Sequence, residues 1–158
     1  MTDYTALATA IKTTLLADAW IGDPANVKIV ETGKRGFSVQ DEKDTLYFGD
    51  GDLPALAIIA NASPQEQSVN TTNEIRSLVA PEIMVVSKHR DAQAGIVAQD
   101  TIVANVERVL EKQKSSSADL GIDAFVEQVS SSTVQEKKGE YYYFVSTIVA
   151  RVELTTAF

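Results

Sequence analysis

Residues 141–152, YYYFVSTIVARV, are the stretch that decides the fold. Aromatic and β-branched residues dominate this stretch, and successive side chains of a strand point to opposite faces of a sheet. One face would carry Tyr142, Phe144, Ser146, Ile148, Ala150 and Val152, and the other Tyr141, Tyr143, Val145, Thr147, Val149 and Arg151. The pattern predicts a long strand that is largely apolar on both faces. We expect both faces to be covered, in part by another subunit.

Two amphipathic helices and a second strand flank this element. Apolar residues recur every three or four positions from Asp3 to Ala19 and again from 91 to 112, which is the spacing of a helical stripe. Asp91 is suited to cap the second helix, and Gly95 weakens its first turns. The stripe of that helix comprises Ile96, Val103, Val106 and Leu110, widened by Ile102 and Val109. A strand at 125–129 is expected, with a turn at 136–140 that joins it to the final strand.

Further strands are expected at 27–30, 37–39 and 53–60, and one long or bent strand at 71–89 with a bend or bulge at its proline. The 53–60 segment is almost continuously apolar, which is typical of a strand covered on both faces. Mobile loops are expected near 40–52 and 61–70. This order predicts one α+β domain over residues 1–158, with an antiparallel or mixed β-sheet and two amphipathic helices packed on one face.

Composition excludes several classes of function. The 158 residues carry a net charge of −8 and include one His and no Cys. Disulfides, thiolate metal sites and cysteine nucleophiles are therefore excluded, together with most histidine-based sites. No apolar run reaches the roughly 20 residues of a membrane helix, and the first residues lack the features of a signal peptide, so we expect a soluble protein that stays where it is made. The acidic balance argues against broad binding to nucleic-acid backbones.

Two constellations have the residue types of a functional site without its spacing. Asp50-Gly51-Asp52, in an acidic segment at 41–52, resembles the start of a calcium loop, but no later acidic ligand follows. Ser87, His89 and Asp91 have the residue types of a hydrolase triad, but the chain has no G-x-S-x-G elbow. A solvated turn explains the first set. The end of a strand, followed by the cap of a helix, explains the second. We expect no catalytic residue, metal or cofactor.

The aromatic run Tyr141, Tyr142, Tyr143 and Phe144 has two interpretations. It forms either a sheet core or an interface, because aromatic residues are enriched at protein contacts. A strand that is aromatic on both faces has more apolar surface than two helices can cover. The candidate surface for self-association or partner binding consists of Tyr141, Tyr142, Tyr143, Phe144, Trp20 and Phe37.

The order of elements resembles the tail terminator family of long-tailed bacteriophages. The resemblance is carried by the first helix, the LPALAI strand at 53–58, the IMVV strand at 83–86 that leads into the 91–112 helix, and the closing strand at 141–152. It implies a small α+β subunit, without enzymatic activity, that forms a hexameric ring on the end of the tail tube. Such a ring stops tube growth and offers the surface to which the head–tail connector binds. The resemblance also implies assembly in the cytoplasm of the bacterial host and a final location in the tail or neck region of the virion, where DNA passes through the lumen.

Other functions stay open from the sequence. Another neck, head–tail joining or minor tail subunit would have similar elements and a different partner. A cytoplasmic domain that binds a small ligand would have a pocket between its helices and sheet, and a hydrolase would use Ser87, His89 and Asp91. A ring former should show a concentration-dependent oligomer, whereas a pocket protein should be a monomer or dimer that a ligand stabilises.

Overall fold

The computed structural model describes residues 4–32, 48, 50–59, 66–69, 74–114 and 124–157. Two α-helices, seven strands and two short 3₁₀ turns follow one another along these residues. Their order is α1 (Tyr4–Ala17), β1 (Ile29–Glu31), η1 (Asp50–Asp52), β2 (Ala55–Ile59), β3 (Glu66–Val69), β4 (Glu74–Val79), β5 (Glu82–His89), α2 (Ala92–Glu111), η2 (Lys112–Lys114), β6 (Ala124–Lys138) and β7 (Tyr141–Ala157). Neither described helix is long and apolar enough to cross a membrane.

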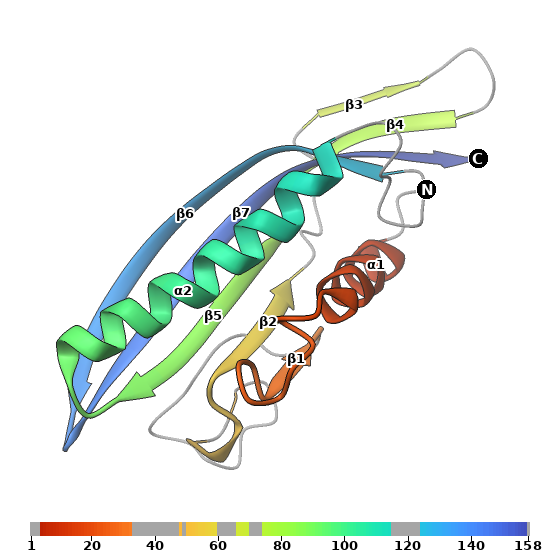
Figure 1. Ribbon diagram of the computed structural model, residues 1–158. Helices are drawn as coiled ribbons and strands as arrows, with labels where there is room; N and C mark the ends of the chain where they lie inside the picture. Colours follow the sequence, from red (N-terminus) through yellow and green to blue (C-terminus); the bar gives the residue numbers. More distant parts are fainter. Residues whose placement is uncertain are drawn as a thin grey trace.

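The described strands form one mixed sheet around β7 (Figure 1). The order is β1-β2-β5-β7-β4-β3, and β6 pairs with the other side of β7. The β1–β2 pair is parallel, and all other pairs are antiparallel. The α+β class and the mixed sheet are therefore confirmed.

Strands β4 and β5 lie end to end along the same side of β7. Val79 pairs with Val152 and Glu82 with Val149, so the register is unchanged across the break. Between them Ala150 donates its backbone N–H to the carbonyl oxygen of Pro81 at 3.0 Å. Proline has no N–H of its own to return to the ladder, so the strand is interrupted there. The segment that was predicted as one long or bent strand is therefore two strands, which are separated at the proline where a bend or bulge was expected.

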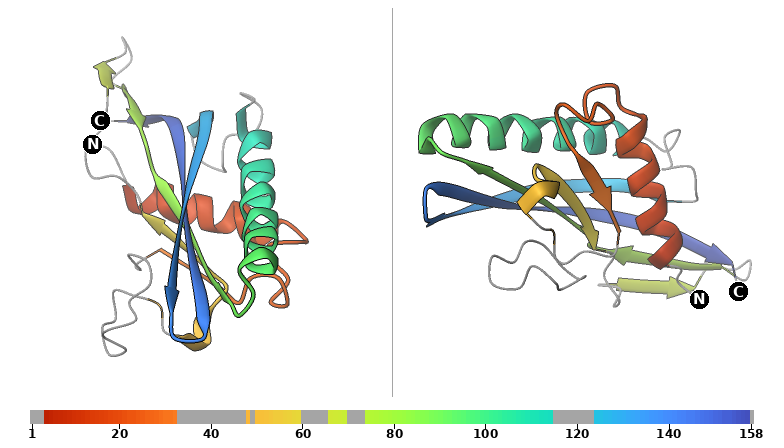
Figure 2. Two further views of the ribbon diagram at one scale, coloured as in Figure 1. Left: turned by 90° about the vertical axis from the view of Figure 1, so that its left-hand side faces the viewer. Right: turned by 90° about the horizontal axis from the view of Figure 1, so that it is seen from below.

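Both helices share one core with one face of the sheet. Helix α1 contributes Leu7, Ile11 and Leu15, and α2 contributes Ile102, Val103, Val106, Val109 and Leu110. From the sheet come Leu56, Ile58, Ile83, Val85, Ile148, Ala150 and Val152, which alternate along their strands and so belong to one face. Helix α2 runs along the sheet, and α1 runs across the direction of α2 (Figure 2).

A second apolar cluster lies on the opposite face of the sheet. It contains Phe48, Leu53, Ala55, Ala57, Val86 and Tyr143. Residues 55–58 of β2 are all buried, because their side chains alternate between the two clusters. The prediction that this strand is covered on both faces is confirmed.

Three predicted boundaries are wrong. Strand β3 lies inside the 61–70 segment that was expected to be a connection, and it pairs with β4 as an outer strand. Strand β6 extends from the expected 125–129 to Lys138, and β7 extends to Ala157. Strands β3 and β6 lie at edges of the sheet. Backbone hydrogen bonds to one neighbour hold an edge strand in place, so its sequence need not alternate between apolar and polar residues. The expected strand at 37–39 and most of both expected loops lie outside the described residues.

Ile96 does not join the buried stripe of α2. Its side chain is 42% exposed, whereas Gly95 and Gln99 on the same helix are buried. The position lies at the flank of the helix, outside the stripe whose side chains are buried. Asp91 caps the helix as predicted, because its carboxylate accepts the backbone N–H of Gln93 at 3.1 Å.

Candidate functional site

The aromatic run divides between the two faces of the sheet. Phe144 is 1% exposed and lies under α2, where its ring borders Gly95. Tyr143 is 8% exposed and belongs to the opposite cluster. These two rings are therefore held inside the subunit, and Tyr141 and Tyr142, which are half-buried, are the members of the run that reach the surface.

The two half-buried tyrosines carry cations on their rings. Lys88 Nζ lies 4.9 Å and Arg90 Cζ 5.3 Å from the centre of the Tyr141 ring, and Arg90 also donates a 3.3 Å hydrogen bond to the Tyr141 hydroxyl. On the other face, Lys137 Nζ lies 5.3 Å from the centre of the Tyr142 ring. Cation–π contacts of this kind hold a positive side chain in place without neutralising its charge.

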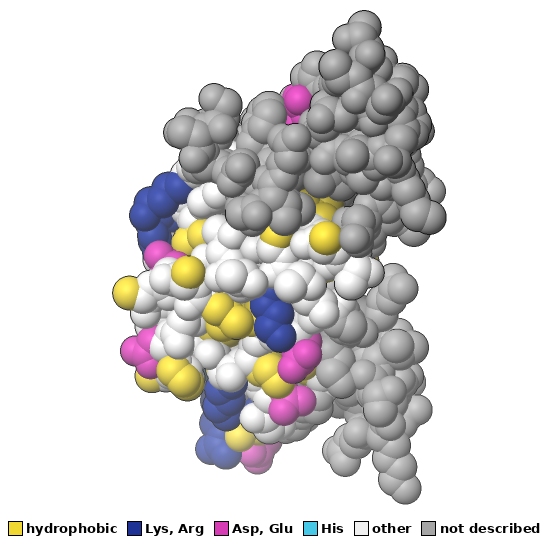
Figure 3. All heavy atoms as spheres, turned by 90° about the vertical axis from the view of Figure 1, so that its right-hand side faces the viewer, with side chains coloured by type: hydrophobic (Ala, Val, Ile, Leu, Met, Phe, Trp, Pro, Cys, Tyr) yellow, Lys and Arg dark blue, Asp and Glu magenta, His cyan; other side chains and the backbone are white. Residues whose placement is uncertain are grey.

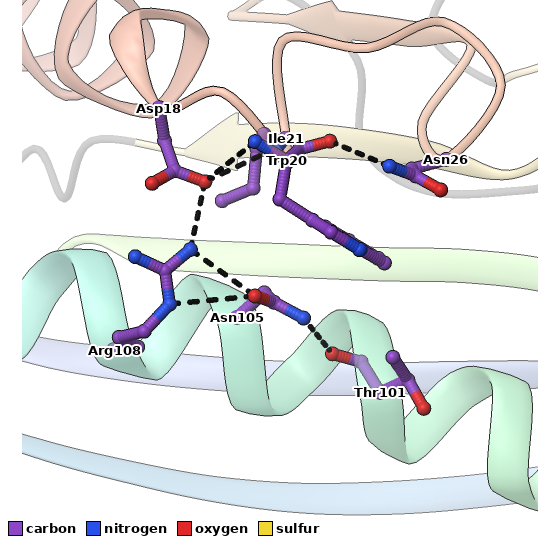
Figure 4. A network of polar contacts seen from close by, with 7 residues as sticks. All are labelled: Asp18, Trp20, Ile21, Asn26, Thr101, Asn105 and Arg108. Atoms are coloured by element: carbon purple, nitrogen blue, oxygen red, sulfur yellow. Dashed lines mark hydrogen bonds and ion pairs between the residues drawn. The ribbon is translucent and has the colours of Figure 1, made fainter.

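Trp20 sits in a loop that a polar network ties to α2 (Figure 4). Asp18 Oδ2 accepts the backbone N–H groups of Trp20 and Ile21, each at 3.2 Å, and a 2.8 Å hydrogen bond from Arg108 Nη2. Arg108 also donates to Asn105 Oδ1, with distances of 3.1 and 3.3 Å. The hydrogen bond from Arg108 holds the pKa of Asp18 below its ordinary value.

A groove of about 360 Å³ lies beside this loop. Trp20, Asn26 and Pro54 line one side, and His89, Ala98 and Ile102 line the other. Its wall is mostly apolar, and the described polar groups there already have partners: Asn26 donates to the carbonyl of Trp20, and Nδ1 of His89 accepts the backbone N–H of Asp91. On the face that Figure 3 shows, charged side chains of both signs are interspersed with apolar ones over the described part of the molecule.

Each of the three residues that could form a hydrolase triad has a structural role. Ser87 is buried and donates its hydroxyl to Gln99 at 2.5 Å, while Asp91 caps α2. His89 accepts from the backbone of Asp91 and not from a serine hydroxyl. The geometry gives no support to a nucleophile–base pair at these residues.

Phe37 and the acidic residues Asp41, Glu42 and Asp44 lie outside the described residues. In the part of the chain that the structure describes, no three His, Asp or Glu side chains form a group that could hold a metal ion.

A buried glutamine joins α2 to the sheet. Gln99 is 1% exposed; it accepts from Ser87 and donates to the carbonyl of Val85 and the hydroxyl of Ser146, both at 2.9 Å. Ser146 also shares a 2.7 Å hydrogen bond with Thr133 on β6. The sequence reasoning missed this network, although a glutamine in the apolar stripe of α2 was a visible signal.

The outer edge of β6 is the longest open strand edge among the described residues. Strand β6 has 15 residues and pairs only with β7, whereas the other outer strands, β1 and β3, have three and four. Figure 2 (left) shows β6 and β7 crossing as a two-stranded arm, and no third described strand pairs with β6.

The hydrogen bond from Ala150 to Pro81 shows which backbone groups of β6 point toward β7 and which point away from the sheet. Its N–H points to Pro81 on the β5 side, so by alternation the N–H and C=O groups of Val145 and Tyr143 point toward β6. The β6 partners of these two, Val134 and Glu136, point back toward β7. Because the direction alternates along a strand, the backbone N–H and C=O groups of Thr133, Gln135 and Lys137 point outward from the sheet.

No protein-family model matches the chain, and no curated protein matches it. Among solved structures, a chain described as "Virion of native gene transfer agent (GTA) particle" aligns with 93% of this chain and 94% of its own length. The identity is 15% and the TM-score 0.47, a likeness that assigns no role to this chain.

Proposed function

We propose that this chain is a structural protein of a phage-like virion that associates edge to edge into a ring of about six subunits on the end of a tail tube. In that position the ring stops tube growth and forms the interface to the head–tail connector. The order of elements that resembles the tail terminator family supports this role. The partners are then further copies of the chain, the tail tube protein and the connector, and DNA passes through the lumen without specific contacts.

The observation that carries the proposal is the open edge of β6. A long unpaired edge is a template for adding another chain, and soluble monomers normally cover or disrupt such edges. Apolar side chains flank this edge on both faces: Val134 is 68% exposed, and Ile96 of α2 is 42% exposed. A neighbouring subunit would satisfy the outward backbone groups and bury both side chains.

Gln135→Pro tests this edge with little effect on the fold. The N–H of Gln135 points outward, so proline removes a donor that β7 does not use, and proline is tolerated on edge strands. The matched control is Gln135→Ala, which keeps the N–H. Solution mass is measured against concentration by light scattering, and the heaviest species is imaged by negative stain.

We expect rings from the wild type and from Gln135→Ala, and monomers from Gln135→Pro with an unchanged circular dichroism spectrum. Rings that persist in Gln135→Pro would exclude the β6 edge as the contact. A wild-type chain that stays monomeric at every concentration would overturn ring formation itself.

The groove beside Trp20 favours a second candidate function, the binding of a small ligand. Its volume of about 360 Å³ falls in the range of small-molecule sites, and its wall is apolar with few polar groups. Trp20 is the single tryptophan, so its fluorescence reports directly on occupancy. A monomer whose Tm rises, and whose tryptophan emission shifts, with a compound from a ligand screen would favour this function over the ring.

A further inference from the structure

Four cations gather at one end of the acidic chain. Strand β5 ends beside the β6–β7 turn, where His89 pairs with Tyr142 and Lys138 with Tyr141. Figure 1 shows this end, with the turn, the end of β5 and the start of α2 close together. The cations there are Lys88, Arg90, Lys137 and Lys138, and together with the rings of Tyr141 and Tyr142 we call them the basic tip.

The exposed cations of the basic tip are preorganised and keep their charge. Arg90, Lys137 and Lys138 are exposed, and within the described part of the chain none of them forms an ion pair. Two of the three are held by aromatic rings instead, Arg90 on Tyr141 and Lys137 on Tyr142. The two-residue turn that closes the hairpin starts at Gly139 with φ of +63°, a conformation that favours glycine. Arg90 and Lys137 are therefore presented at defined positions.

The charge pattern of the tip favours an acidic protein surface over a nucleic acid. Asp91, Glu136 and Glu140 lie among the cations, so the tip has no continuous positive field for a polyphosphate. Individual lysine and arginine side chains can still pair one to one with separate carboxylates. A second copy of this chain, with its net charge of −8, offers such carboxylates.

The complementary surface lies on α2, away from the tip. Ala98 and Ile102 line the groove beside Trp20, so that flank of the helix faces the α1 side. The helical repeat places Asp100 and Glu107 on the opposite flank, above β6. Neither carboxylate forms an ion pair within the described residues, and Asp100 is exposed.

We infer that the basic tip of one subunit docks on the Asp100–Glu107 flank of α2 in the next subunit. The two surfaces are unlike, so the contact is head to tail and can close into a ring. The contact lies beside the open edge of β6, and the inference rests on the proposed function, of which it names one contact.

Charge reversal tests the contact. The tip variant is Lys137→Glu/Lys138→Glu, and the matched control, Lys12→Glu/Lys28→Glu, changes the net charge equally at two lysines outside the tip. A third variant adds Asp100→Lys/Glu107→Lys to the tip variant, so that both surfaces are reversed and again complementary. Ring assembly is measured by light scattering from low to high NaCl, with circular dichroism to check folding.

At low salt we expect at least a tenfold loss of association in the tip variant, little change in the control and recovery in the variant with both reversals. Association of the wild type should weaken as NaCl rises. Unchanged association in the tip variant, or no recovery after the second reversal, would overturn this contact while leaving the ring in place. A tip variant that loses only binding to duplex DNA would overturn it too and indicate a nucleic-acid site. A wild type that never associates would instead overturn the proposed function.

Discussion

Gly95 is the residue at which α2 approaches the sheet most closely. A Cβ atom at this position would lie 2.8 Å from Cζ of Phe144 and 2.9 Å from Cβ of His89. The phenylalanine ring is 1% exposed and has little room to move. The glycine that weakens the helix in isolation is therefore required by the packing of the helix on β7.

Gly95→Ala should lower the free energy of unfolding by about 1–3 kcal/mol, as overpacking does, despite the better helix propensity of alanine. Urea denaturation measures this change. Gly51→Ala is the control, because no heavy atom lies within 4 Å of its added Cβ, and the free energy should change by less than about 0.5 kcal/mol. A Gly95→Ala protein more stable than the wild type would show that helix propensity outweighs the close contact.

Asp18 makes the stability of the folded state depend on pH. Its pKa is lowered chiefly by the hydrogen bond from Arg108, so the folded state binds this proton less tightly than the unfolded state. The stabilisation is therefore present above the ordinary carboxyl pKa and is lost as the pH falls through the lowered value. Asp18→Asn should melt at a slightly lower temperature at pH 7, and the difference from wild type should shrink at strongly acidic pH. A difference that is the same at both pH values would mean that the charge of Asp18 is not its cause.

At the scale of elements, Gln99 joins α2 to β5 and β7. Gln99→Leu keeps the volume but removes the hydrogen bonds of this side chain to Ser87, to Ser146 and to the carbonyl of Val85, and we expect a loss of about 2–4 kcal/mol in the free energy of unfolding. Gln93→Leu makes the same change at an exposed position of the same helix and serves as the control. Equal effects of the two changes in urea denaturation would contradict the role of this network.

The elements differ in how well their sequences predict them. Helix α2 and the 53–60 strand bury whole apolar stripes, so periodicity and composition reveal both. The later part of β6 is instead polar and exposed, and it is a strand because β7 offers a partner along its full length. Pairing of this kind depends on a distant segment, and no local pattern of residues 130–138 indicates it.

At the scale of the whole molecule, the candidate surface divides into residues that hold the fold and residues that reach outward. Phe144 and Tyr143 are buried inside one subunit, and Tyr141 and Tyr142 carry the cations of the basic tip. Trp20 lines the groove, and Phe37 stays a prediction. The role of these residues in assembly is a proposal, for which the β6 edge and the basic tip provide separate tests.

The sequence by itself determined the α+β class, both helices, the N-cap at Asp91, the irregularity at Pro81 and the long final strand. Each of these depends on interactions between residues that are near in the chain, such as a cap, a missing N–H or a repeating apolar face. Only the tertiary structure decided that β6 pairs along most of β7 with an open edge, that Gln99 joins α2 to β5 and β7, and that cations from the ends of β5 and β6 meet at one tip. These features depend on the pairing of distant strands, which also selects the side chains that are buried and those that remain for a partner.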